Sequence, residues 1–258
     1  MRKVFFLWLF IAAAFFANSQ GKTLYTVNTV KPKQGMRSAF EEGWKKHVAN
    51  FHSKDHKLNV YEIMSGDRIG TYQIVEGPIA YEDMDKERAD AKAHGEDLQK
   101  LFLLTNEDGR TNGTYRWDDT ASFNRNVTAD KFQVTVTHLK FGTAGGGTLR
   151  ESRRNALLQA KLMPTSNFSF NYYVKLWSGS DPVHVSIRNL KQGYKELDSD
   201  FFPANPNPLP PNAFEEAYKK DYGKEAWDTR TKFLENQGNV ASREVFLTKL
   251  RKDLSSPQ

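Results

Sequence analysis

Hydrophobic and polar positions follow the same order in the two halves of the chain. Residues 26–32 and 135–141 are rich in β-branched side chains with polar neighbours, which is typical of strands. A turn containing glycine follows each, and then a helical pattern over residues 35–51 and 148–162. Each predicted helix has one apolar face. The residues on these faces are Met36, Phe40, Trp44, Val48 and Phe51 in the first helix, and Leu149, Ala156, Leu157 and Ala160 in the second.

A β-hairpin, a second helix and a last strand are predicted after each of these helices. A Ser-Gly pair, Ser65-Gly66 or Ser178-Gly179, connects the two strands of each hairpin, which is a reasonable hairpin signal. The predicted ranges are 59–64, 69–75, 81–104 and 114–117 in the first half, and 172–177, 183–188, 213–235 and 242–250 in the second.

The order in each half is thus β-α-β-β-α-β, the ferredoxin-like unit, and the fold class is α+β. We predict a first unit over residues 20–118 and a second over 131–258, joined by a linker within 118–130. Residues 201–211 contain five prolines, so they form an irregular insert in the second unit.

The opening strand and helix (27–51) and the hairpin with its Ser65-Gly66 turn (60–76) resemble the dimeric α/β-barrel superfamily. Antibiotic-biosynthesis-type monooxygenases and NIPSNAP-like proteins belong to this superfamily. The resemblance covers residues 24–250 and implies a tandem repeat of two ferredoxin-like units, whose sheets close into an intrachain barrel. The superfamily includes oxygenases, haem enzymes and proteins without known catalysis, so the fold alone does not give the activity.

Residues 1–19 are predicted to be a cleavable signal peptide. Arg2 and Lys3 give a positive start, residues 4–17 are uncharged, and small residues precede the expected cleavage point before Gln20. A retained anchor is the alternative, but the apolar stretch is shorter than the ~20 residues of a spanning helix. We therefore expect a secreted or periplasmic protein with no membrane span after cleavage.

The charge and the cysteine content of the chain argue against a nucleic-acid-binding protein and against a disulfide-stabilised fold. Removing Arg2 and Lys3 from 37 basic residues leaves 35 against 31 acidic residues, a net charge of +4. Basic residues are scattered among acidic ones, so we expect no nucleic-acid partner. The chain has no cysteine, so burial must stabilise it without disulfides. It also lacks the motifs of a P-loop and of the common hydrolases.

Alternation along the strands of the second half predicts a polar face that lines a cavity. Val185 and Ile187 would face the helices, and the polar set would face the barrel. The members of this set are Tyr173, Lys175, His184, Ser186 and Arg188. Arginine, lysine and histidine are hydrogen-bond donors, so we predict a small acidic or carbonyl-bearing ligand. The alternative is that this set is the exposed face of an open sheet.

Three histidines are candidates for chemistry. His47 lies in the apolar stripe of the first helix, where it would be a haem ligand or a general base. The alternative is a buried histidine hydrogen-bonded to the backbone. His138 and His184 lie on predicted strands of one half and are candidates to converge in the fold. His47 and His52 are five positions apart and no metal-binding motif accompanies them, so we expect no metal site.

No catalytic constellation stands out, so the sequence favours an exported small-ligand-binding or interaction protein of the cell envelope without catalysis. The alternative is a monooxygenase-like or haem-handling enzyme that uses the barrel cavity and one of His47, His138 or His184. Haem is the cofactor that this alternative implies. Two units in one chain satisfy each other, so a monomer is as compatible with the sequence as a homodimer.

Overall fold

The computed structural model describes residues 21–52, 56–108, 110–123, 128–140, 142–162, 169–177, 182–198, 209–234 and 237–257. The strands are β1 (Leu24–Val30), β2 (Leu58–Ile63), β3 (Tyr72–Ile79), β4 (Thr111–Phe123), β5 (Lys131–Leu139), β6 (Phe170–Leu176), β7 (Val183–Asn189) and β8 (Val240–Leu250). The helices are α2 (Arg37–Phe51), α3 (Ala91–Phe102), α4 (Thr143–Leu162), α5 (Ala213–Tyr222) and α6 (Lys224–Leu234). Short 3-10 helices lie at Tyr81–Asp85, Gly193–Leu197, Gln237–Asn239 and Lys252–Leu254.

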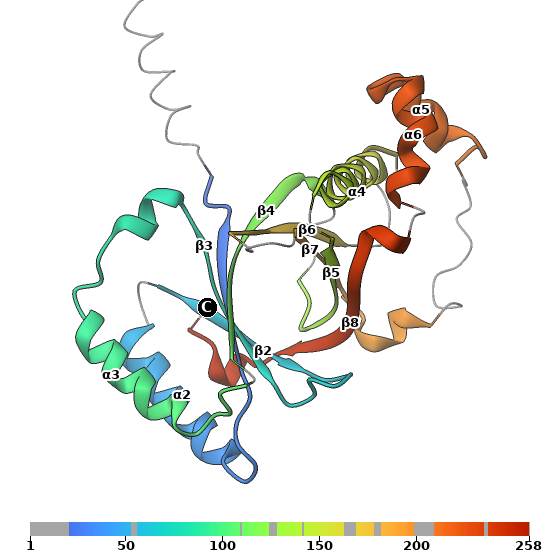
Figure 1. Ribbon diagram of the computed structural model, residues 1–258. Coiled ribbons are helices and arrows are strands. Elements are labelled where there is room, and N and C mark those ends of the chain that lie inside the picture. The colour runs from blue at the N-terminus through green and yellow to red at the C-terminus, as the bar shows by residue number, and fades with distance from the viewer. Residues whose placement is uncertain are drawn as a thin grey trace, which may run out of the picture.

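The strands form one closed antiparallel barrel in the order β1-β3-β2-β8-β5-β7-β6-β4 (Figure 1). The first four strands of the chain are neighbours in this barrel, and so are the last four. Two seams join the halves. At one seam β2 pairs with β8, which places Tyr61 opposite Leu250, and at the other β4 pairs with β6, which places Trp117 opposite Tyr173. Closure leaves no free edge that could pair with another chain.

Alternate residues of each strand point into the barrel or out toward the helices. In the first half the outward residues Val60 and Ile74 pack with Phe40 and Trp44 of α2. In the second half the outward Tyr172 packs in a cluster with Ala156 of α4. Helices α2 and α3 therefore cover one side of the barrel, and α4, α5 and α6 lie on the other (Figure 1).

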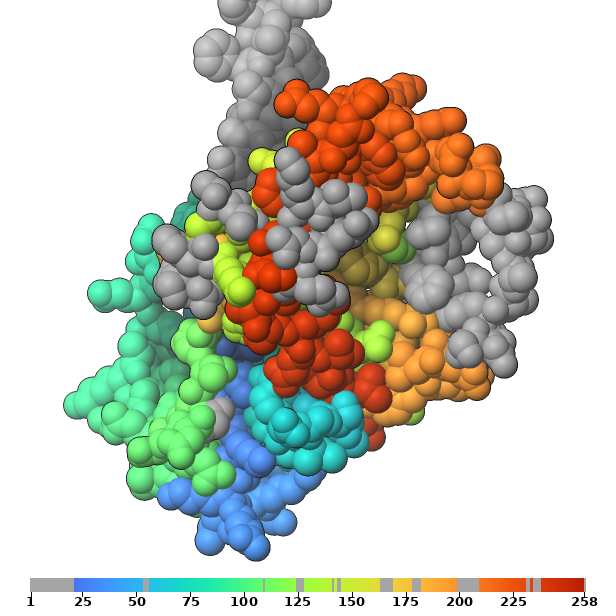
Figure 2. Space-filling view, turned by 45° about the vertical axis from the view of Figure 1, so that its right-hand side comes forward, coloured from blue at the N-terminus to red at the C-terminus, as the bar shows by residue number. Residues whose placement is uncertain are grey.

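The outer face of β8 is more open to solvent than the rest of the sheet. Val245 points outward from this strand and is 51% exposed. Figure 2 shows β8 at the surface, in red, between the cyan turn of β2 and β3 and the orange helices of the second half. An apolar side chain at this position is therefore outside the core.

Several predicted element boundaries were wrong. The single helix expected over 81–104 is a 3-10 turn followed by α3, and the helix expected over 213–235 is divided at Gly223, which has a φ of 89°. β4 extends into the predicted linker. Helix α4 begins at Thr143, inside the glycine-rich segment, where a Cβ on Gly147 would collide with the ring of Phe233 in α6.

Some sequence predictions fall wholly or partly outside the described residues: the signal peptide (1–19), part of the linker (118–130), the Ser178-Gly179 turn and most of the proline-rich insert (201–211). Among the residues that are described, no helix combines the length and the apolar character needed to cross a membrane.

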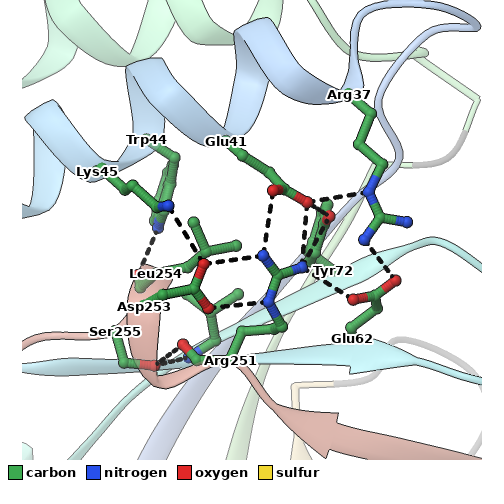
Figure 3. Close-up of polar contacts among 11 residues, drawn as sticks. Arg37, Glu41, Trp44, Lys45, Glu62, Tyr72, Arg251, Asp253, Leu254 and Ser255 are labelled. Atoms are coloured by element: carbon green, nitrogen blue, oxygen red, sulfur yellow. Dashed lines mark hydrogen bonds and ion pairs between the residues drawn. The ribbon is translucent and has the colours of Figure 1, made fainter.

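A network of charges connects the end of the chain to the first half (Figure 3). Arg251, just after β8, donates hydrogen bonds to Glu41 of α2 at 3.0 and 3.1 Å and to Glu62 of β2 at 2.9 Å. Arg37 forms ion pairs with the same two carboxylates at 2.9 and 2.8 Å, and the Tyr72 hydroxyl donates to Glu41. The hydrogen bond from Arg251 is the largest cause that lowers the pKa of Glu41, to about 2.

The residues after Arg251 add backbone contacts to β2. The Trp44 indole donates to the carbonyl oxygen of Leu254 at 3.0 Å. The side chains of Ser255 and Ser256 accept from backbone N–H groups of β2, each at 2.9 Å, and the N–H of Ser256 donates to Leu58 at 3.0 Å. The C-terminal segment therefore fixes the β2–β8 seam from outside the barrel.

Replacing Arg251 with alanine is expected to lower the free energy of unfolding by about 3 kcal/mol, because it leaves two partly buried carboxylates short of a partner. The matched control is Lys252→Ala, which breaks an exposed ion pair with Asp130 and should cost less than about 1 kcal/mol. Urea unfolding of both variants measures the difference. Equal losses in the two variants would show that Arg251 does not hold the seam.

Candidate functional site

The barrel interior contains a cavity of about 410 Å³. It lies toward the end of the barrel where β1 begins, and all eight strands contribute to its wall. The lining residues are mostly aromatic, aliphatic or amide-bearing, and none of those described is charged. They are Tyr25, Val27, Asn59, Tyr61, Gln73, Val75, Gly77, Pro78, Tyr115, Trp117, Phe132, Val134, Val136, Asn171, Tyr173, Val185, Ile187, Asn189 and Thr248.

Four tyrosines from four strands supply the phenol groups of this wall: Tyr25, Tyr61, Tyr115 and Tyr173. Tyr25 and Tyr173 pack edge to face with their ring centroids 5.5 Å apart. Burial raises the pKa of all four phenols, that of Tyr61 to about 12. These groups therefore stay protonated near neutral pH and can donate hydrogen bonds.

Amide side chains add donors and acceptors to the same wall. Asn171 donates to the side-chain oxygen of Asn189 at 3.3 Å, and Asn59 and Gln73 line the cavity from β2 and β3. Amides and phenols carry no charge, so the site offers hydrogen bonds in apolar surroundings. Such a combination of apolar wall and few polar groups is typical of small-molecule sites.

Toward the other end the barrel is filled by a cluster of buried side chains that includes Ile63, Val183 and Phe246. The guanidinium of Arg68 lies 4.5 Å from the centroid of the Phe246 ring and pairs with Glu244 at 2.7 Å. A second, more polar hollow of about 610 Å³ opens beside Arg68. The charges of the barrel interior therefore gather at this end, away from the aromatic cavity.

The structure places the predicted residues of β5 and β6 on the barrel side. Tyr173 lines the cavity. Lys175 is also on the inward face, since it lies opposite Tyr115, which lines the cavity. It is two residues beyond Tyr173, toward the end of the barrel where Arg68 and Glu244 lie. His138 likewise follows Val136 on the inward face of β5. Neither Lys175 nor His138 is among the residues that line the cavity.

The predicted faces of β7 were reversed. Val185 is paired with the inward Tyr173 and lines the cavity with Ile187, so His184, Ser186 and Arg188 point toward the helices. The His184 ring stacks on Tyr172 at 5.4 Å, and Arg188 donates to the carbonyl oxygen of Glu196 at 2.7 Å. The five polar residues expected to share one face are therefore not brought together. Alternation alone does not show which side of a sheet faces a cavity, because both sides here are largely buried.

His47 lies outside the barrel, between α2 and α3. Its side chain is fully buried, and its Nδ1 atom lies 2.8 Å from a carboxylate oxygen of Asp97 in α3. His52 follows the end of α2, and its Nε2 atom lies 3.2 Å from Nε2 of His94 in α3. Burial lowers the pKa of all three histidines, to about 4 for His52 and His94, so the imidazoles are neutral at pH 7.

His94 was not identified from the sequence, because it stands alone on a polar segment. The available signal was the order of elements: both helices of a βαββαβ unit pack on the same face of its sheet. A histidine late in the first helix and one early in the second are therefore candidates for contact.

Neither the lining of the aromatic cavity nor the surroundings of His47 fit haem. Haem iron is held by His, Cys, Met or Tyr. None of the described residues lining the barrel cavity is His, Cys or Met, and the raised pKa values of its tyrosines oppose the phenolate form. His47 is packed among the rings of Trp44, Phe51 and the other two histidines at 4.9–5.2 Å, so four rings occupy the positions next to it that a porphyrin would need.

Neither a protein-family model nor a curated protein matches the sequence. Solved structures do match. An anthrone oxidase-like protein is 12% identical, with a TM-score of 0.51, over 90% of this chain and 92% of that one. A proposed monooxygenase from Lactobacillus acidophilus is 10% identical, with a TM-score of 0.48, over 92% and 97%. A variant chlorite dismutase from Candidatus Nitrospira defluvii is 8% identical, with a TM-score of 0.48, over 92% and 94%.

At these identities the likeness concerns the fold. The protein described here has the α+β fold with a closed antiparallel barrel that was expected from its sequence. This coarse expectation is confirmed.

The buried phenol of Tyr61 should make stability fall at alkaline pH. An unfolded tyrosine ionises near pH 10, whereas the folded Tyr61 keeps its proton until about pH 12, so the folded state loses its advantage as pH rises through that window. In Tyr61→Phe we expect the free energy of unfolding to fall less steeply with pH. The difference in slope from the wild type should reach at most roughly 1.4 kcal/mol per pH unit. Unfolding free energies measured from pH 9 to 12 test this, and identical slopes in both proteins would contradict it.

Proposed function

We propose that the protein binds a neutral, largely aromatic small molecule with carbonyl or hydroxyl oxygens inside its barrel. The observation that carries this proposal is the aromatic cavity of about 410 Å³ with no charged side chain among its described lining residues. Phenol hydroxyls donate hydrogen bonds to carbonyl oxygens, and aromatic walls stack on planar ligands. A charged ligand would lose its hydration in this cavity without gaining a partner of opposite charge.

The proposal keeps one part of the ligand class expected from the sequence. A carbonyl-bearing ligand suits the phenol donors of the cavity. An acidic ligand is not proposed, because His184 and Arg188 face the helices and Lys175 does not line the cavity.

We also propose the location, the assembly and the repeat organisation of the protein, starting from its sequence. The N-terminal pattern supports export to the periplasm or the outside of the cell, as a monomer or a homodimer. The strand order supports a tandem repeat, since each half contributes its four strands in the arrangement fourth-first-third-second: β4-β1-β3-β2 and β8-β5-β7-β6. This is the strand order of a ferredoxin-like unit.

A second candidate is an oxidase or monooxygenase that acts on the same ligand. Its support is the anthrone oxidase-like protein of similar fold, together with phenol donors that would stabilise an oxyanion formed from a ketone. A base is needed to form that oxyanion. No carboxylate, imidazole or amine is among the described lining residues, so binding without catalysis remains the first proposal.

Anthrone, a neutral tricyclic ketone, is the probe for both candidates. We expect the protein to bind it in isothermal titration calorimetry. Val75→Phe should weaken binding at least tenfold, about 1.4 kcal/mol, because the larger ring fills the cavity. Val245→Phe, on the exposed face of β8, is the matched control and should bind as the wild type does.

The outcomes separate the candidates. Binding without oxygen consumption supports a binding protein, and binding with conversion of anthrone supports the oxidase. Failure of the wild type to bind, or equal binding by Val75→Phe, would overturn the cavity as the site.

A further inference from the structure

Three histidines converge on the helix-covered side of the first half, away from the barrel cavity. His47 comes from α2, His52 from the residue after it and His94 from α3. Their ring centroids are 4.9–5.2 Å apart in all three pairs. One ring nitrogen from each lies within 4.8 Å of the other two. Three imidazoles, from α2, from the residue that follows it and from α3, therefore surround one point.

Hydrogen bonds at the far side of two rings decide which nitrogen faces that point. The Nδ1 atom of His47 lies 2.8 Å from the Asp97 carboxylate, and Nδ1 of His52 lies 2.7 Å from the carbonyl oxygen of His56. Both acceptors place the proton on Nδ1, which leaves the lone pair on Nε2. The Nε2 atom of His47 is buried and has no hydrogen-bond partner in the structure.

The spacing of the nitrogens suits a small transition-metal ion. Zinc binds imidazole nitrogens at about 2.0–2.1 Å in a tetrahedron, so two ligand nitrogens lie roughly 3.3 Å apart. His52 and His94 already present their Nε2 atoms 3.2 Å apart. The unpartnered Nε2 of His47 supplies the third ligand with a small adjustment of the rings.

We propose that His47, His52 and His94 form a binding site for a divalent transition metal of the zinc class. The hydrogen bonds of His47 to a carboxylate and of His52 to a backbone carbonyl are the outer contacts that metal-bound histidines usually make. Imidazole ligands favour zinc, cobalt, nickel and copper over magnesium and calcium. Three protein ligands leave the fourth position to water. This site does not depend on the ligand of the barrel.

The charged side chains around the three histidines are compatible with the positive charge of a metal ion. Arg88 is the nearby cation, but it is paired with Asp90 at 3.0 and 3.1 Å and also donates to the carbonyl oxygen of Phe51. Asp97 adds a carboxylate directly behind His47. The ring of Phe51 packs on His47 and His94 at 5.1 and 5.4 Å and forms an apolar side of the site.

A cobalt titration of the purified, chelator-treated protein tests the proposal. We expect one equivalent of Co²⁺ to bind, to give the visible absorption of tetrahedral cobalt, and to be displaced by Zn²⁺. His94→Gln should weaken binding by more than 100-fold, and Asp97→Asn by roughly 10- to 100-fold. His138→Gln, which removes an imidazole from the other half of the chain, is the matched control and should bind as the wild type does.

Absence of tetrahedral cobalt absorption in the wild type would overturn the proposal, and so would unchanged binding in His94→Gln. In either case the three histidines would be a hydrogen-bonded group within the helix layer. The wild-type titration needs no variant, so it decides the matter even if a substituted protein fails to fold. Circular dichroism of His94→Gln shows whether its loss of binding has a folding cause.

Discussion

A charged network on the outside of the barrel joins the last strand to the first half of the chain. Arg251 leaves the last strand and meets Glu41 and Glu62, which belong to the first helix and the second strand. This contact joins elements about two hundred positions apart, so it forms only when both halves are in place. The following residues then bind the backbone of β2 through Ser255 and Ser256. The β2–β8 seam is therefore secured by charges on its outer side.

With these charges outside, the described lining of the aromatic cavity carries no charged side chain. Strand alternation separates the two environments: Glu62 points toward the helix layer, whereas its neighbours Tyr61 and Ile63 point into the barrel. In the aromatic cavity the phenols keep their protons because ionisation there would have no solvent to support it. A site of this kind selects ligands by shape, stacking and hydrogen bonds, with little contribution from net charge.

The two halves have the same strand order, but the polar side chains between their helices differ. In the first half, histidines of α2 and α3 face one another. In the second, Glu151 of α4 is buried against Arg154 at 2.7 Å and accepts a hydrogen bond from Tyr218 of α5. An ion pair with a phenol is a satisfied structural contact. In the first half a buried ring nitrogen without a partner, Nε2 of His47, faces two further imidazoles, and a ligand is therefore proposed there.

The sequence by itself determined most of the order of the elements and the α+β class, because apolar spacing and turn residues report local structure directly. The closed barrel was implied by the resemblance to a known superfamily. It did not determine which face of β7 lines the cavity, since Val185 and His184 are buried on opposite sides of the same sheet. Nor did it bring His94 to His52, because that contact depends on how two helices pack. Local patterns specify what each segment becomes. Only the packing of distant segments decides which side chains meet, and here that packing created both the cavity and the histidine cluster.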